Sequence, residues 1–179
     1  MRTALMALGT LIVASVYCGK GNAQIASHQH GVATLRLIQD GFDIYVEFES
    51  PGADILGFEH EPQTPEQVQA LALARQQFES IDTLLLSEAD CETVQHRLLT
   101  AGYDAATDEH AHDDHHGHAH AGFTASYRLT CSSEGFSTTV DIQLFRHFET
   151  IEQLNIEWFT AAGQGAQRLD RGGNSRLVL

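Results

Sequence analysis

The segment Val32–Glu49, VATLRLIQDGFDIYVEFE, decides the fold class of this chain. Two runs rich in apolar residues flank Asp40 and Gly41, a dipeptide that is typical of tight hairpin turns. From Phe42 to Phe48 every second side chain is apolar, which is the period of a half-buried β-strand. The segment therefore predicts a β-hairpin.

The rest of the sequence predicts further strands and one helix. Apolar residues alternate at 123–131, 140–144 and 154–158, and glycine turns separate two short runs at 163–169 and 175–179. Between the hairpin and these strands, Thr64 and Pro65 are typical of a helix start, and apolar residues recur on one face until Leu86. We therefore expect an α+β fold in a single domain, an antiparallel sheet with one amphipathic helix on a face.

The first 23 residues have the pattern of a signal peptide. Arg2 precedes an apolar run at 4–17, and the small residues Gly21 and Ala23 follow it. The run is shorter than the roughly 20 apolar residues that cross a bilayer. Tyr17 before Cys18 argues against lipid attachment, which normally needs a small residue there. We therefore predict a mature domain at 24–179 that is exported and has no membrane-inserted segment after cleavage.

The charge of the chain excludes several classes of partner. The formal net charge is −14, and removing Arg2 and Lys20 with the signal peptide makes it two units more negative and leaves no lysine. Such a surface repels nucleic acids and anionic membranes and attracts cations. With 42% hydrophobic residues, the chain is nevertheless typical of a folded domain.

Two cysteines remain in the mature chain, Cys91 and Cys131. Exported proteins meet an oxidising compartment, so we expect a disulfide between them. If the runs that carry them pair as antiparallel strands, the midpoint of the two cysteines is residue 111. We therefore expect the disulfide to close the base of the loop around that residue and to contribute roughly 4 kcal/mol of stability.

That loop contains the histidine-rich tract Asp108–Gly122, DEHAHDDHHGHAHAG, within a polar insertion at 104–122. Imidazole is a preferred ligand of zinc, copper and nickel, and neighbouring carboxylates add oxygen ligands. Two readings compete with a metal site: a solvated linker, and an interaction element that merely chelates. The metal-binding reading assigns ligand roles to His110, His112, Asp113, Asp114, His115, His116, His118 and His120.

A stricter motif lies within the tract. His110, His112, Asp114 and His115 fit the His-x-His-x-Asp-His pattern of metallo-β-lactamase-type zinc hydrolases. Such enzymes need a buried apolar strand leading into the motif, whereas AGYDAATDE at 101–109 is polar. A zinc-dependent hydrolase is therefore the less favoured alternative, and we predict a protein that is not an enzyme.

Other histidines lie outside the tract. His28 and His30 point to the same side of an extended segment, and Glu59 and His60 precede the predicted helix. We predict an ordered second metal site from His28, His30 and His60, with Glu59 as an oxygen ligand or supporting partner. His96 and His147 lie in strand-like runs and are interpreted as structural.

The segments HQHGVATLRL, FESPGADILGFEHEPQT and GQGAQRL, together with the acidic histidine tract between two cysteine-bearing strands, resemble the ZrgA-type periplasmic zinc-regulated proteins. The resemblance covers essentially the whole mature chain. It implies Zn(II) binding in the periplasm of a Gram-negative bacterium, in support of high-affinity zinc uptake. We expect the partner to be a periplasmic zinc solute-binding protein or an ABC importer. A copper or nickel buffer is the alternative, because imidazole sites prefer copper intrinsically.

Overall fold

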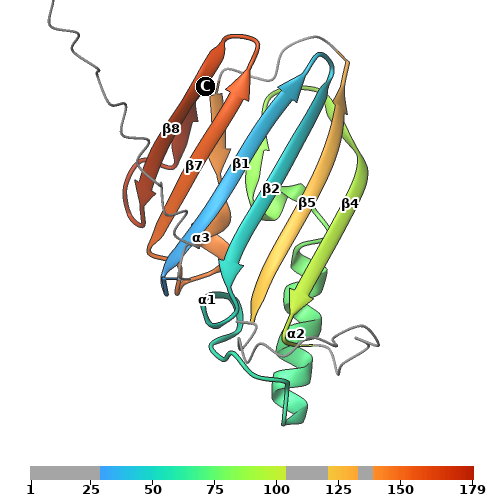
Figure 1. Cartoon of the computed structure of the whole chain (residues 1–179), viewed down its shortest axis with the longest axis vertical. Coiled ribbons are helices and arrows are strands. Elements are labelled where there is room, and N and C mark those ends of the chain that lie inside the picture. Colours follow the sequence, from blue (N-terminus) through green and yellow to red (C-terminus); the bar gives the residue numbers. More distant parts are fainter. Residues whose placement is uncertain (1–28, 104–120, 133–138) are drawn as a thin grey trace, which may run out of the picture.

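The structure is a computed structural model that describes residues 29–103, 121–132 and 139–179 (Figure 1). The predicted signal peptide, His28 and the tract histidines lie outside the described residues. The described part forms two sheets and three short or medium helices. The expected single-domain, mainly β fold is thus found, with more helices than the one predicted.

The larger sheet has six strands in the order β4-β5-β2-β1-β7-β8. All neighbouring strands are antiparallel except β1 and β7, which are parallel. The prediction of one antiparallel sheet was therefore wrong at this central pair. The strands are β1 (Val32–Asp40), β2 (Asp43–Pro51), β4 (Cys91–Ala101), β5 (Gly122–Cys131), β7 (Gln153–Thr160) and β8 (Gly163–Asp170).

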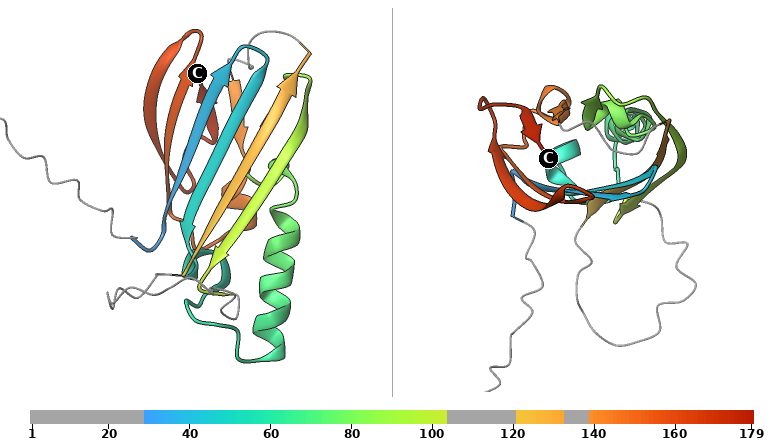
Figure 2. Two further views of the ribbon diagram at one scale, coloured as in Figure 1. Left: turned by 45° about the vertical axis from the view of Figure 1, so that its right-hand side comes forward. Right: turned by 90° about the horizontal axis from the view of Figure 1, so that it is seen from above.

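A second, three-stranded sheet has the order β3-β6-β9 and was not predicted as a separate sheet. Its strands are β3 (Leu85–Ser87), β6 (Thr139–Ile142) and β9 (Arg176–Val178), and the helical elements are α1 (Ala53–Leu56), α2 (Pro65–Gln77), the 3-10 helix η1 (Ile81–Thr83) and α3 (Leu144–His147). The helices and this small sheet cover one face of the six-stranded sheet (Figure 2). The core lies between these two layers.

Phe78 is the centre of that core. It is fully buried, and its ring lies 5.4 Å from Phe48 and 5.7 Å from Phe123 on the large sheet, and 5.2 Å from Phe148 in the opposite layer. Burying an aromatic side chain of this size contributes about 2–3 kcal/mol. Phe78 therefore fixes the end of α2 against the sheet.

The hairpin prediction is confirmed: β1 and β2 pair antiparallel across the Asp40–Gly41 turn. The predicted inward face of β5, at alternate positions from Phe123 to Cys131, is buried throughout. The predicted helix start is also confirmed, because the Thr64 side chain accepts a hydrogen bond from the Gln67 backbone N–H at 3.3 Å.

The predicted helix end near Leu86 is wrong, because α2 ends at Gln77. Phe78 leaves the helix to enter the core, and the Ser80 hydroxyl accepts the N–H of Asp82 and starts η1. Val68, expected on the buried face, is 56% exposed. Leu144, expected in a strand, begins α3 instead.

The disulfide between Cys91 and Cys131 is confirmed, but its predicted place at the base of the tract is wrong. The two cysteines are paired residues at the first position of β4 and the last position of β5. The ladder continues from there to the pair Ala101 and Gly122, where the tract leaves the hairpin. At about 3.3 Å per residue, the disulfide is roughly 30 Å from the tract.

Candidate metal centre

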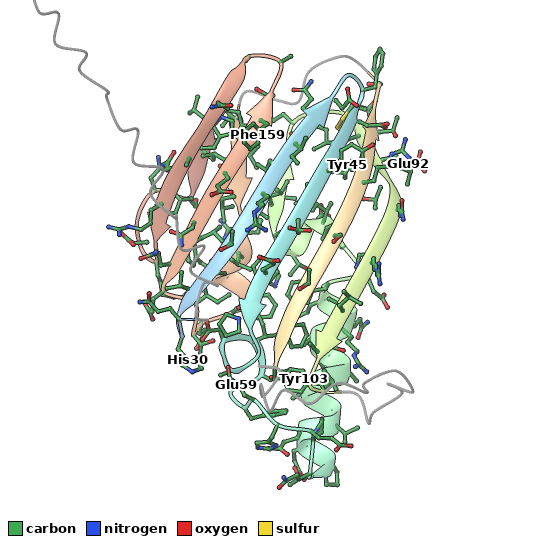
Figure 3. All side chains as sticks on the ribbon, in the orientation of Figure 1. His30, Tyr45, Glu59, Glu92, Tyr103 and Phe159 are labelled. Atoms are coloured by element: carbon green, nitrogen blue, oxygen red, sulfur yellow. A yellow bond between two sulfur atoms is a disulfide. The ribbon has the colours of Figure 1, made fainter. Side chains whose placement is uncertain are left out.

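Three segments meet at the end of the large sheet from which the tract leaves (Figure 3). His30 directly precedes β1, Glu59 lies in the turn that follows β2 and α1, and Tyr103 follows β4. Because β1 starts and both β2 and β4 end at this end of the sheet, residues far apart in the sequence become neighbours. The candidate centre is built from these segments.

Asp54 in α1 is the most constrained side chain of the centre, and sequence reasoning missed it. The residue is 4% exposed. Its Oδ2 accepts a hydrogen bond from the Gly31 N–H at 2.8 Å, and its backbone carbonyl accepts one from the Thr150 hydroxyl. These contacts hold Asp54 against the start of β1.

His30 faces two carboxylates. Its Nδ1 lies 3.8 Å from Oδ1 of Asp54 and 3.8 Å from Oε1 of Glu59. Two ligand atoms at 2.0–2.1 Å from a tetrahedral zinc ion are about 3.3 Å apart. The two distances from His30 Nδ1 exceed that value by about half an ångström, so the imidazole lies close to each carboxylate but slightly too far to share a zinc ion with it in this arrangement. We refer to these three residues as the strand-end cluster.

Burial raises the pKa of the Asp54 carboxyl above its ordinary value. The hydrogen bond from Gly31 and the neighbouring His30 act in the opposite direction, while the charge of Glu59 adds to the rise. A carboxylate that is desolvated beside a second carboxylate is stabilised by a bound cation, because the cation offsets both unfavourable effects. The cluster is thus electrostatically suited to a metal ion.

Among the described residues, no group of three or more His, Cys, Asp or Glu side chains is arranged so that it could hold a metal ion as it stands. The strand-end cluster offers one imidazole and two carboxylates at distances slightly too long for coordination. Zinc ordinarily takes four ligands, of which three come from protein in open sites. The cluster therefore has the composition of an open site rather than a closed structural one.

The chain matches the family described as "ZrgA family zinc uptake protein" over residues 27–178. The chain belongs to the ZrgA family. The match covers nearly all of the predicted mature domain and bears out the resemblance noted in the sequence. A search of curated proteins gives no match. Membership of this family indicates that the chain has a role in zinc uptake and hence in metal homeostasis.

The predicted metal ligands of this ZrgA protein do not all lie together in the described part of the chain. His30 and Glu59 lie close together, whereas the Nδ1 of His60 lies 2.9 Å from the Glu61 carbonyl oxygen and its ring lies 5.2 Å from Phe58. A single site that also contains His28 and His60 stays a prediction. The tract ligands, from His110 to His120, lie outside the described residues.

The two histidines interpreted as structural lie on ordered elements. His96 on β4 stacks on Tyr127, with ring centroids 4.9 Å apart, and His147 ends α3 next to Phe148. Neither is part of the strand-end cluster. Within the described ranges, no helix is long and apolar enough to span a membrane.

Tyr103 borders the cluster and is 3% exposed. Its hydroxyl donates to the Phe58 carbonyl at 2.5 Å. Burial, with a smaller effect from Glu59, raises the pKa of this hydroxyl. The phenol therefore stays protonated at neutral pH and keeps its proton for that hydrogen bond.

Proposed function

We propose that this protein captures Zn(II) in the periplasm and holds it for a zinc importer, with His30, Asp54 and Glu59 as its ordered site. The protein acts by binding and release, not by catalysis. The observation that carries the proposal is the buried carboxylate of Asp54, which faces a second carboxylate and an exposed imidazole. Family membership supports zinc as the metal.

The histidine tract serves as a second, weaker set of sites that collects zinc for the ordered one. Its proposed ligands are His110, His112, Asp113, Asp114, His115, His116, His118 and His120, and His28 and His60 are further candidate ligands. Support comes from the position of the tract, since the Gly52 N–H donates to the Ala121 carbonyl at 2.8 Å, two residues from Asp54. Ordering many loop residues costs about 1–2 kcal/mol each, so the tract should bind more weakly.

The exposure of the His30 side chain is consistent with the release of zinc to a partner protein. The His30 side chain is 65% exposed, while that of Asp54 is 5% exposed. An incoming ligand from a periplasmic zinc solute-binding protein or an ABC importer can displace the exposed imidazole first. Bound zinc would then leave by stepwise ligand exchange.

The test is a calorimetric zinc titration of the mature protein and of three variants, each with one residue changed. Asp54→Asn keeps an acceptor for the Gly31 N–H but removes the charge, and His30→Ala removes the imidazole. Asp43→Asn is the control, because Asp43 starts β2 at the other end of the sheet and pairs with Arg128. We expect the tightest phase to weaken at least tenfold in the first two variants, a loss of about 1.4 kcal/mol, and to persist in the control.

A protein that lacks 104–120 should keep the tight phase and lose the weaker sites. If Asp54→Asn and His30→Ala bind zinc like the wild type, the ordered site is refuted and the tract alone carries the function. Competition of copper and nickel against zinc at the tight phase tests the alternative metals. A periplasmic preparation that contains copper rather than zinc would favour the buffer reading.

A further inference from the structure

The described residues that flank the polar segment 104–120 are buried on both sides. Tyr103 and Ala121 are the last described residues on either side of it, and they are 3% and 4% exposed. Tyr103 follows β4, Ala121 precedes β5, and both lie at the end of the sheet that carries the strand-end cluster. Tyr103 and Ala121 are therefore buried anchors on either side of 104–120.

Both anchors rest on the segment that follows β2. The Tyr103 hydroxyl donates to the Phe58 carbonyl, and its ring meets the Phe58 ring edge-on at 5.7 Å. On the other side, the Gly52 N–H donates to the Ala121 carbonyl. A Cβ atom at Gly52 would lie 1.8 Å from the Tyr103 hydroxyl oxygen, so only glycine leaves room for this contact. The ring thus lies directly against the backbone that leads into α1.

The hydrogen bond from Tyr103 acts on the peptide group between Phe58 and Glu59. That peptide group is planar, so fixing the Phe58 carbonyl also fixes the N–H and the Cα position of Glu59, the point from which its side chain leaves the backbone. The Glu59 carboxylate must reach the His30 ring, 3.8 Å away, to complete the cluster. No other hydrogen bond to the Phe58 carbonyl is observed in the described part of the chain.

We propose that Tyr103 is a positioning residue for zinc binding, which sets the Glu59 carboxylate opposite His30 through its hydrogen bond to the Phe58 carbonyl. The inference rests on the proposed function of the strand-end cluster and adds a residue that contacts no ligand itself. Tyr103, the last described residue before 104–120, would thus orient the ordered site from a buried position.

The fold supplies a matched control for this role. Tyr127 is 2% exposed and its hydroxyl donates to the Phe78 carbonyl at 2.6 Å. Tyr103 and Tyr127 are thus two buried tyrosines, each bound to the backbone carbonyl of a phenylalanine. Tyr127 lies under α2 in the core and does not contact the segment that carries Glu59.

The experiment compares Tyr103→Phe with Tyr127→Phe in the full mature protein. Each variant keeps the ring and loses one hydroxyl, and circular dichroism and Tm check that both fold. Zinc affinity is measured by calorimetry, and Co(II) is added as a spectroscopic probe of ligand geometry. We expect Tyr103→Phe to weaken the tight zinc phase by about tenfold, the effect usual for residues that orient metal ligands, and to change the visible Co(II) spectrum. Tyr127→Phe should lower Tm and leave both readouts unchanged.

Equal weakening in the two variants would show a general stability effect and overturn the inference, as would wild-type binding by Tyr103→Phe. Asp54→Asn, run alongside, separates the two proposals. If Asp54→Asn loses the tight phase while Tyr103→Phe keeps it, the site stands and only the role of Tyr103 fails. If both variants bind like the wild type, the site itself is wrong.

Discussion

Two aspartates at opposite ends of β2 have opposite electrostatic environments. Asp43 begins the strand near the disulfide, where its carboxylate accepts hydrogen bonds from the Thr130 hydroxyl at 2.6 Å and from Arg128 at 2.7 Å. These contacts, with Thr130 the larger cause, hold the pKa of Asp43 below its ordinary value. Asp54 follows the other end of the strand, and burial raises its pKa.

The two ends differ in the counter-charge that the chain itself supplies to each aspartate. Arg128 gives Asp43 its counter-charge, and its guanidinium also lies over the Tyr45 ring at 5.9 Å. The only cationic neighbour of Asp54 in the described part of the chain is His30, which is charged only when protonated. Asp43 therefore has its counter-charge within the chain, while for Asp54 the proposed function assigns that role to a bound metal ion.

The largest expected effect comes from removing the covalent link at the Asp43 end. Replacing Cys91 and Cys131 together by serine frees a closed loop of 40 residues, and we expect the free energy of unfolding to fall by about 4 kcal/mol. Urea denaturation measures it. Under conditions where the variant is folded, the tight zinc phase should remain. Loss of that phase from folded protein would contradict the separation of the two ends.

The next effect concerns the stability of the metal-free protein. The raised pKa of Asp54 means that the folded chain binds more protons than the unfolded chain at intermediate pH. Its contribution to stability is therefore present at low pH and is lost as the pH rises through the folded pKa. Asp54→Asn removes this loss, so the metal-free variant should be at least as stable as the wild type at pH 7. Thermal melts in chelator measure it, and a lower Tm would show that the charge itself holds the fold.

Zinc binding should depend on pH through the imidazoles. Free histidine titrates near pH 6.5, and ligand histidines must be deprotonated. We expect the zinc affinity to fall steeply between about pH 7 and 5.5, with protons released on binding. Calorimetry in buffers of different ionisation enthalpy measures the proton count. An affinity that stays flat over this range would indicate sites made of carboxylates alone.

The smallest expected effect is that of Asp43→Asn. The lowered pKa of Asp43 means that its contribution to stability is present above the ordinary pKa of aspartate and is lost as the pH falls through the folded value. Because the group is exposed to solvent, its ion pair contributes little. The variant should melt slightly below the wild type at pH 7, and the gap should close as the pH falls below the ordinary pKa of aspartate. A gap that persists in acid would mean that the Thr130 hydrogen bond matters without the charge.

The strands and the helix start were predictable because they depend on neighbours in the sequence. Alternation at 42–48 and the Thr64–Pro65 pair both report local geometry, and both predictions are confirmed. The parallel pairing of β1 with β7 joins Val32 to Gln153, and no periodicity encodes such a contact. The helix end was missed because it is set by core packing and not by the helical repeat in the sequence. Phe78, directly after α2, is fully buried in the core.

The candidate site, like the fold, was predictable only in part. His30 and Glu59 were found by residue type, since imidazole and carboxylate are known zinc ligands. Asp54 was missed because it is a single acid between Ala53 and Ile55, and its partner Gly31 lies 23 residues away. The one available signal was the segment around Pro51, which carried the family resemblance without showing which of its residues matters.

The parallel contact between β1 and β7 also limits the order in which the strands of this protein can pair during folding. β1 lies between β2 and β7 in the sheet, so it has one neighbour until Gln153–Thr160 has been synthesised. Contacts of such long sequence separation form late and slow the folding reaction. A chain that stops before β7 would leave the edge of β1 unpaired, and unpaired strand edges are where proteins aggregate. The final fold is therefore reached only when nearly the whole chain is available to fold.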